Sequence, residues 1–275
     1  MTSRILATGF KYLTLVIASV VTLLPLGVVL FASLKSRTEY AQTGPLDLPS
    51  NWLNFENFIT FFVKGHIVQG LINTGFILAV SLAGTILIGS MTAYAIDRFT
   101  FRFKKLVVGA FLVGALVPSV TTQVATFQII NNLELYNTIW APIVLFLGTD
   151  IISIYIFVQF MQSISKSLDE AATLDGANRF SIYWYIILPL LKPAIATVVI
   201  IRGIAIYNEF YIPFLYMKSP ELSVISTALF RFKGPFGAQW EVIAAGTMVV
   251  IIPTLVLFLL LQKYIYNGIT SGATK

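Results

Sequence analysis

A run of small and acidic residues at 170–176 is the stretch of this chain best suited to chemistry with a partner. It reads Glu-Ala-Ala-Thr-Leu-Asp-Gly and separates two strongly apolar halves of the sequence. Ser167, as an N-cap, and the carboxylates of Asp169 and Glu170 suit the start of a helix, where exposed N–H groups favour a hydroxyl and negative charge. Gly176 permits a positive φ, and therefore a turn, after that helix. An exposed Glu170 could make a charge-assisted contact with a basic residue of another protein.

A second short helix is expected directly after this turn, which Asp175 and Gly176 would shape. The segment 178–188 is aromatic on much of its surface. Pro189 stops or kinks this helix, because proline has no N–H to donate and its ring collides with the preceding turn. Two short helices joined at a glycine make a compact knob, which is a suitable shape for docking into a groove on another protein.

A second group of polar residues, Arg202, Asn208 and Glu209, lies in the otherwise apolar stretch 193–217. If that stretch crosses a membrane, its charged groups are costly unless they face a partner or a water-filled path. Arg202 and Glu209 are seven residues apart, which would place them on one face of a helix. They could screen each other, pair across a subunit interface, or line a translocation path. A purely structural contact between helices is the other interpretation.

The sequence lacks the usual signatures of catalysis. No G-x-x-x-x-G-K-[ST] phosphate loop and no G-x-S-x-G elbow is present, and there is no Cys for a disulfide or a thiolate metal site. His66 is the single histidine, so neither a Ser/His/Asp triad nor a metal site with several ligands is indicated. We therefore expect a chain that is not an enzyme by itself and has no cofactor or metal of its own.

The composition points to a membrane. Of 275 residues, 57% are hydrophobic and only 11% are charged, with a mean hydropathy of +0.85, whereas soluble domains have about 25% charged residues. Long apolar runs indicate helices rather than a barrel. The net charge of +6 is better explained by basic anchors at a membrane face than by nucleic acid, because no basic helix with interleaved aromatic residues is present.

The expected fold is an all-α integral membrane protein with about six transmembrane helices in one domain that covers residues 1–275. About 20 helical residues cross the hydrocarbon core. A short helix around 51–62 would lie on the membrane surface, and Gly75, Ala79 and Ala83 form a stripe of small residues for helix packing. The expected spans are 12–34, 69–96, 106–129, 138–160, 193–217 and 240–262, with the two-helix loop at 161–192.

The basic residues predict the orientation of these spans. With alternating spans, eleven Lys and Arg fall on the side that holds both termini and the loop 161–192, and six fall on the other side. Cytoplasmic segments carry the excess of positive charge. Both termini and the loop 161–192 are therefore expected in the cytoplasm.

The loop has a pattern that identifies a family. E-A-A, three residues, G, nine residues and I-x-L-P is complete here and resembles the EAA loop of binding-protein-dependent ABC importer permeases, which sits in a cleft of the ATPase subunit. The resemblance implies that the residues of this loop couple the chain to a separate ATPase. The residues concerned are Glu170, Ala171, Ala172, Asp175, Gly176, Leu188 and Pro189.

Weaker similarities run along most of the chain and favour the carbohydrate branch of this family, that of the smaller maltose permease subunit. Asn208-Glu209-Phe210 followed by Pro213 resembles its fifth-span signature, although Tyr207 replaces the usual tryptophan. The other similar segments are 32–35, 73–74, 93–99 and the tail 268–275.

The resemblance also implies partners in a prokaryotic cell membrane. These are a homologous second permease, two ATP-binding subunits that hold ATP and magnesium, an extracytoplasmic solute-binding protein, and a sugar or oligosaccharide, moved by alternating access. The loop 218–239 would face the binding protein, and the tail 263–275 would approach the ATPases. A permease for another solute, such as a glycerol phosphate or a peptide, and a channel or secondary transporter remain the alternatives.

Overall fold

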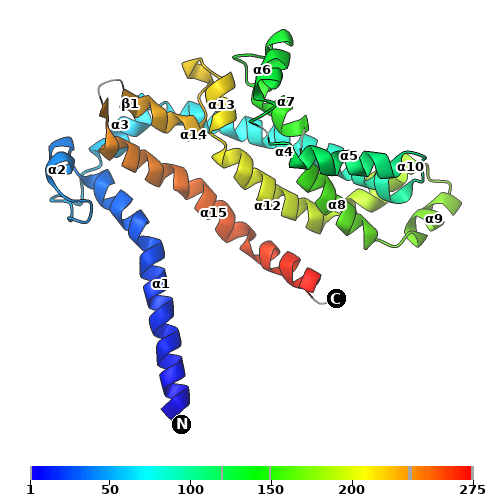
Figure 1. Ribbon diagram of the computed structural model, residues 1–275, viewed down its shortest axis with the longest axis horizontal. Coiled ribbons are helices and arrows are strands. Elements are labelled where there is room, and N and C mark those ends of the chain that lie inside the picture. The colour runs from blue at the N-terminus through cyan, green and yellow to red at the C-terminus, as the bar shows by residue number, and fades with distance from the viewer. Residues whose placement is uncertain (1, 119, 149, 235–236, 274–275) are drawn as a thin grey trace. The chain divides into compact units, whose positions relative to one another are not determined.

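The computed structural model describes residues 2–118, 120–148, 150–234 and 237–273. Within these ranges it describes every side chain except those of residues 2–7, 148, 257 and 260–273. The described chain is almost entirely helical (Figure 1) and divides into two compact units, residues 1–68 with 227–255 and residues 69–226 with 256–275. The helices and strands are α1 (Thr2–Leu34), α2 (Arg37–Gln42), α3 (Glu56–Lys64), α4 (Ile67–Arg98), α5 (Lys104–Leu116), α6 (Gln123–Asn132), α7 (Trp140–Gly148), α8 (Ile151–Gln162), α9 (Ser167–Leu174), α10 (Arg179–Ile182), the π-helix η1 (Tyr183–Ile187), α11 (Leu188–Leu190), α12 (Lys192–Asn208), α13 (Tyr211–Tyr216), the 3-10 helices η2 (Pro220–Leu222) and η3 (Leu229–Phe232), α14 (Ile225–Ala228), β1 (Lys233–Gly234), β2 (Gly237–Ala238) and α15 (Trp240–Ala273).

The first unit contains α1 and the polar segment that follows it. Asn57 of α3 is buried, and its side-chain amide donates to the carbonyls of Ser33 and Lys35 at 2.9 and 2.8 Å. The N–H of Ser50 donates to the carboxylate of Glu39, which lowers the pKa of that carboxyl. These bonds hold the loop after α1 in a defined conformation. The short helix expected near 51–62 is found as α3, slightly later in the chain.

A small apolar cluster closes the first unit. Phe61 and Phe232 pack with ring centroids 5.6 Å apart, and Ile67, Ala228 and Val242 complete the buried set. Gly246 on α15 makes this contact possible, because a Cβ there would lie 2.4 Å from the Phe61 ring.

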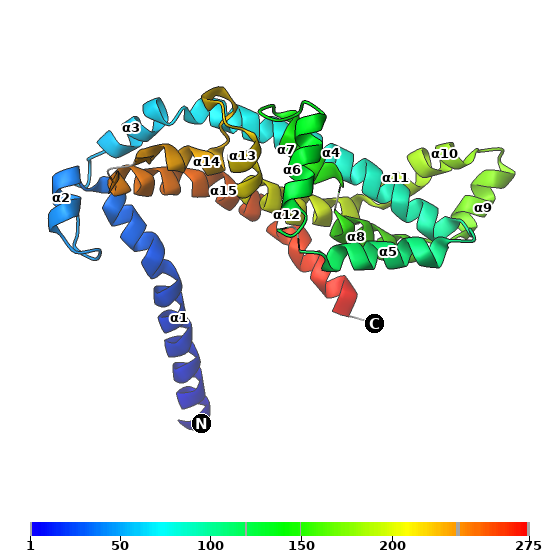
Figure 2. The same ribbon diagram turned by 45° about the horizontal axis from the view of Figure 1, so that its top comes forward.

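The second unit is built on α4, α8 and α12, with the segment 163–191 packed at one end (Figure 2). Ala93, Phe157 and Val198, one from each of these helices, are fully buried. Gly89 of α4 allows α8 to approach, since a Cβ there would lie 3.0 Å from Phe157. The stripe of Gly75, Ala79 and Ala83 is exposed instead, so it does not serve packing between helices of this chain.

Two helices of the described chain are long and apolar enough to cross a membrane, within Thr8–Leu34 and Ile67–Arg98, and up to four spans result if each bent helix pair is one span. The expected span 106–129 is not continuous, because α5 ends at Leu116 before Pro118 and α6 begins at Gln123. The expected span 193–217 is likewise split, since α12 ends at Asn208.

The remaining expected spans differ less from the structure. The region 138–160 is the pair α7 and α8, bent by 43°. The region 240–262 lies within α15, whose described apolar part is Trp240–Val256. The segments 263–273 continue this helix, and the expected contacts of the tail 263–275 lie outside the described side chains.

Asn73 ties α4 to the segment that precedes α14. It is buried, and its side-chain amide donates to the carbonyls of Glu221 and Ser223 at 2.8 and 2.9 Å. Asn73→Ala should lower the free energy of unfolding by about 1–3 kcal/mol, because two hydrogen bonds are lost. Thermal unfolding of the detergent-solubilised protein measures this change. The exposed Gln159→Ala is the control, and equal stability of both variants would contradict the role of Asn73.

Candidate functional site

The run 170–176 forms the end of α9 and a turn. Gly176 has φ +87°, its N–H donates to the carbonyl of Thr173, and the N–H of Ala177 donates to the carbonyl of Ala172. This is the Schellman arrangement, which needs a left-handed residue after the helix. The expectation for Gly176 is therefore confirmed. Ser167, by contrast, is the first helical residue, and the N-cap is Lys166.

After the turn, the chain enters a helix that changes its pitch. The side chain of Asn178 caps α10 by accepting the N–H of Ser181 at 2.8 Å. Residues Tyr183–Ile187 form a π-helix, and the N–H of Leu188 reaches back five residues to Tyr183. A wider turn is physically reasonable here, because Pro189 cannot donate an N–H and its ring would collide with a carbonyl four residues back.

The kink expected at Pro189 occurs two residues later. Helical structure continues through Pro189 to Leu190, and the segment Arg179–Leu190 meets α12 at 70°. Leu191 is the joint, and its side chain is fully buried. Leu188 is half-buried against the apolar cluster, whereas Pro189 is exposed.

The segment 163–191 is seated on α4 and α8 by apolar contacts. Tyr183 is 2% exposed, and its hydroxyl lies 2.7 Å from that of Ser90 on α4. The rings of Tyr94 and Tyr183 pack at 5.5 Å. Ala172 belongs to the same buried cluster, so its small side chain serves packing inside this chain rather than docking against another protein.

A buried ion pair joins α9 to the end of α4. Nε of Arg98 lies 3.0 Å from Oδ2 of Asp169, and the two side chains are 4% and 6% exposed. Arg98 also contacts Asp97 at 2.6 Å and donates to the carbonyl of Ile164 at 2.9 Å. The sequence analysis missed this pair, because it treated Asp169 as a helix-end carboxylate. The sequence does carry an indication of this pair. Asp169 lies three residues before Ala172, so the two side chains share the inner face of α9.

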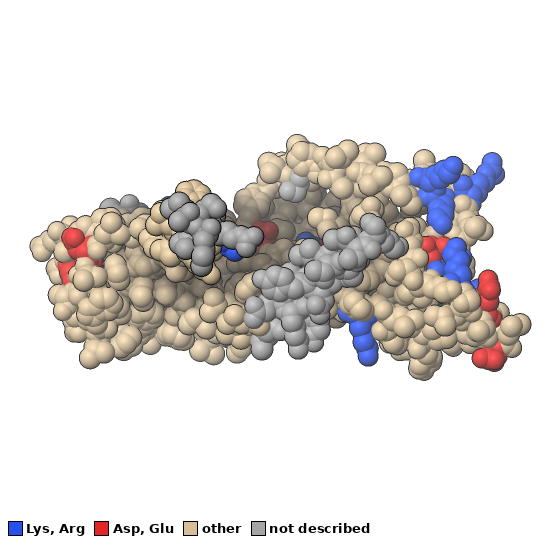
Figure 3. Space-filling model, turned by 90° about the horizontal axis from the view of Figure 1, so that it is seen from below, with Lys and Arg blue, Asp and Glu red and all other residues tan. Residues whose placement is uncertain are grey.

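The outer face of this segment carries a different set of side chains. Glu170, Ala171 and Asp175 are exposed, and Leu174 is 90% exposed. Figure 3 shows Lys and Arg gathered at the end of the second unit that carries α9 and α10. The face formed by α9, the turn and α10 therefore combines a carboxylate, apolar side chains and nearby positive charge, and we call it the loop face. Its exposed aromatic side chains are Phe180, Trp184 and Tyr185.

Arg202 has a partner that the sequence analysis did not single out. Its Nε lies 3.1 Å from Oδ2 of Asp150, and it donates to the carbonyl of Phe146 at 2.9 Å. Asp150 is the N-cap of α8 and accepts the N–H of Ser153. Arg202 and Asp150 are 22% and 9% exposed, so this ion pair is more open than the pair on α9.

Glu209 does not share a helix face with Arg202, because α12 ends at Asn208 and Glu209 is extended. The carboxylate of Glu209 accepts the N–H groups of Tyr211 and Ile212, at 2.8 and 3.2 Å, at the start of α13. The exposed Asn208 donates to the carbonyl of Ile204 in its own helix. The expectation that Arg202 and Glu209 screen each other is therefore wrong.

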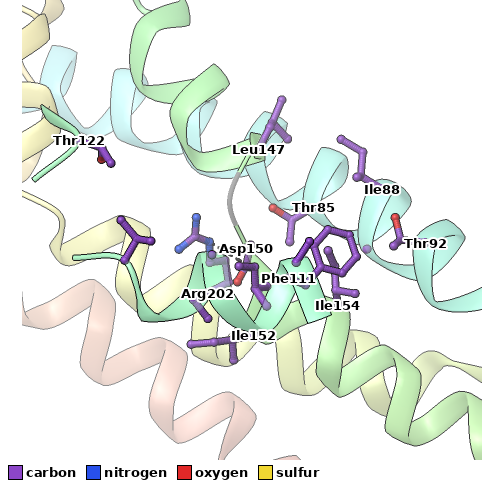
Figure 4. A pocket seen from close by; sticks show the side chains of 16 residues that line it. Thr85, Ile88, Thr92, Phe111, Thr122, Leu147, Asp150, Ile152, Ile154 and Arg202 are labelled. Atoms are coloured by element: carbon purple, nitrogen blue, oxygen red, sulfur yellow. Dashed lines mark ion pairs between the residues drawn. The ribbon is translucent and has the colours of Figure 1, made fainter. Parts of the chain in front are cut away.

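A cavity of about 630 Å³ lies within the second unit between α4, α5 and α8. Figure 4 shows Asp150 and Arg202 at one side of it, with Thr85 and Phe111 facing it from α4 and α5. In the described part of the chain, no three or more His, Asp and Glu side chains are grouped to hold a metal ion.

Comparison with known proteins gives a consistent result. The family model for "Binding-protein-dependent transport system inner membrane component" matches residues 85–271. A probable ABC transporter permease protein, YurM of Bacillus subtilis strain 168, is 33% identical over 83% of this chain and 76% of its own. The galactooligosaccharides transport system permease protein GanQ of the same organism is 30% identical over 97% of this chain and 95% of its own.

A solved structure shares the fold. A chain of a bacterial ABC transporter that imports the acidic polysaccharide alginate superposes with a TM-score of 0.82 over 96% of this chain and 98% of that one, at 20% identity.

Gly176→Val should destabilise the turn after α9. A β-branched residue at φ +87° costs about 1–3 kcal/mol of backbone strain. The measurement is protease cleavage between α9 and α10, which should accelerate. Gly75→Ala is the control, because a Cβ there meets nothing within 4 Å and the position is helical. Unchanged cleavage of the Gly176 variant would contradict the strain argument.

The ion pair on α9 predicts an asymmetric response. Arg98→Met should lower the free energy of unfolding by about 3–5 kcal/mol, because it leaves Asp169 charged and buried without its partner. Asp169→Leu should cost less, since Arg98 keeps Asp97 and the Ile164 carbonyl. The double variant Arg98→Met/Asp169→Leu should recover part of the loss. Denaturant unfolding of all three checks this, and additive single effects would exclude the pairing.

Proposed function

We propose that this chain, which belongs to the family of binding-protein-dependent transport system inner membrane components, is the permease subunit of an ATP-driven importer for a sugar or oligosaccharide. The observation that carries this proposal is the loop face, because it presents Glu170 outward while Asp169 is fixed inward by Arg98. A rigid, exposed segment of this kind suits mechanical coupling to a separate ATPase.

The proposed topology has about six spans, with both termini and the segment 161–192 in the cytoplasm, in one transmembrane domain over residues 1–275. The excess of Lys and Arg on that side supports this orientation. The breaks near Pro118 and Glu209 fit spans composed of two helical pieces, because irregular backbone is tolerated at membrane depth where protein or water surrounds it.

Coupling would proceed through the loop face. Glu170 would contact a basic residue of the ATPase, Asp175 and Gly176 would set the turn, and Ala171 would permit close approach. Leu188 and Pro189 would connect the loop to α12, and Ala172 would hold it on the core. Because the segment 163–191 is joined to α4 by the buried ion pair of α9 and to α12 by the packed joint at Leu191, a displacement of the loop face would reach both helices.

The proposed partners are a homologous second permease, two ATP-binding subunits and an extracytoplasmic solute-binding protein. ATP and magnesium would bind to the ATPases, since the sequence of this chain has no P-loop. The family description supports the binding protein as a partner. The spans would alternate between outward-open and inward-open states as the ATPases close and reopen.

The substrate class rests on the relatives. GanQ is named for galactooligosaccharides, and the structural neighbour belongs to an importer of a polysaccharide. Arg202, Asn208 and Glu209 are proposed to line the translocation path or to contact the second permease. The partly exposed Arg202 at a cavity and the exposed Asn208 support this role, because polar groups at membrane depth need a partner or water.

Glu170→Lys tests coupling in the complete complex, purified from its host membrane with a tag on this chain and reconstituted in vesicles. Reversal of an exposed charge at a charge-assisted contact should reduce ATP hydrolysis and ATP-driven uptake by about tenfold or more. The measurement is magnesium-ATP hydrolysis together with uptake of labelled oligosaccharides.

The matched control for this experiment is Glu56→Lys, which makes the same change at an exposed residue of α3. It should leave hydrolysis unchanged, and both variants should keep their thermal stability. Normal ATPase co-purification and hydrolysis in the Glu170 variant would exclude the coupling role and would restore the channel or secondary-transporter interpretation.

A further inference from the structure

The cavity of the second unit contains the Asp150–Arg202 ion pair as its only charged lining, among the residues that the structure describes. Its volume of about 630 Å³ lies in the range of sites for small molecules. Three threonines, Thr85, Thr92 and Thr122, add hydroxyl groups to a lining that is otherwise largely apolar.

The polar groups of this lining are incompletely satisfied within the described chain. The hydroxyl of Thr85 is buried and has no hydrogen-bond partner, although the residue is only 3% exposed. Nε of Arg202 faces Oδ2 of Asp150 at 3.1 Å without an aligned hydrogen bond. Buried polar groups in proteins are almost always bonded. Nε of Arg98 and both carboxylate oxygens of Asp169 also lack an aligned partner, away from this cavity, so it is the open space beside the more exposed Asp150–Arg202 pair that indicates a ligand or water.

The arrangement indicates the chemistry of that ligand. A carboxylate accepts hydrogen bonds and a guanidinium donates them, so the adjacent pair matches two neighbouring hydroxyls, one donating and one accepting. Phe111 offers an apolar ring on another side of the cavity (Figure 4). Polar groups beside an aromatic ring suit a sugar, which has hydroxyl edges and apolar C–H faces.

The charges also limit the choice of sugar. Arg202 and Asp150 neutralise each other, so the described lining has no net charge. An anionic sugar would compete with Asp150 for Arg202. It would also bring a second negative charge close to Asp150, and like charges at hydrogen-bond range repel strongly where water is excluded. A neutral ring meets no such penalty.

We propose that this cavity is a sugar-contacting site carried by this subunit itself, and that it takes a neutral polyhydroxylated ring, with Asp150 and Arg202 bonded to adjacent hydroxyls. This inference rests on the proposed function, since it names the substrate class and the contacts for the same import pathway. It distinguishes the chain from its structural neighbour, which belongs to an importer of an acidic polysaccharide.

The absence of cysteine in the chain allows a direct test. Thr92→Cys places one thiol at a partly exposed position of the cavity lining in the complete reconstituted complex, and mass spectrometry of this chain follows its alkylation by a small water-soluble reagent. Galactotriose, raffinose and an alginate oligosaccharide are the probes, first assayed for uptake by the same vesicles. A neutral probe that is taken up should slow alkylation by about tenfold at saturation, because the bound sugar covers the thiol most of the time. The alginate oligosaccharide should not slow alkylation.

Two further variants serve as controls. Ala79→Cys lies on the exposed side of the same helix, and no probe should protect it. Asp150→Asn/Arg202→Gln removes both charges together and so leaves no unpaired charge. Added to Thr92→Cys, it should preserve alkylation and lose about tenfold in the affinity for the protecting sugar. Thr122→Cys, at another position of the lining, replaces Thr92→Cys if the latter does not fold.

The outcomes separate the inference from the proposed function. Uptake of a neutral sugar without protection of either thiol would overturn the site and leave the importer assignment intact. Protection that persists in the Asp150→Asn/Arg202→Gln variant would overturn the roles of these two residues. Uptake of the acidic probe alone would overturn the neutral specificity. ATP hydrolysis without uptake of any sugar would reject the substrate class of the proposed function, and the site with it.

Discussion

The buried ion pair between Arg98 and Asp169 is the constraint on which the geometry of the loop face depends. Neighbouring residues of a helix point about 100° apart, so holding Asp169 against Arg98 turns Glu170 outward. Buried ion pairs contribute little net stability, but an arrangement that separates the charges is strongly disfavoured. The pair therefore acts mainly on geometry, because a rotated α9 would leave the buried carboxylate of Asp169 without the partner that Arg98 supplies.

The apolar packing around the loop converts this local geometry into a link with the spanning helices. Tyr183 and Ile187 are buried against α4 and α8, and Leu191 fills the joint before α12. Close-packed interiors transmit displacement instead of absorbing it. The π-turn and the bend of 70° adapt the chain to Pro189 without interrupting this packing. A contact made at the loop face is thus continuous with the helices that would have to move during transport.

The second ion pair, between Asp150 and Arg202, uses the same chemistry in a different environment. Arg98 is 4% exposed, whereas Arg202 is 22% exposed and borders a cavity. A closed pair cannot be reached by a ligand, whereas a pair that borders a cavity can. Burial therefore suits the first pair to a positioning role and the second to the proposed binding role, although the two pairs have similar distances.

The sequence by itself determined the class of protein and the turn chemistry. The apolar composition implies a membrane, and glycine is the residue best suited to a left-handed turn position such as 176. Both properties are local or additive along the chain. The tertiary structure alone decided that Asp169 faces inward, that Arg202 pairs with Asp150, and that Glu209 caps α13 instead of sharing a face with Arg202. Such pairings depend on where distant helices meet and where a helix breaks, and these depend on the packing of many side chains at once.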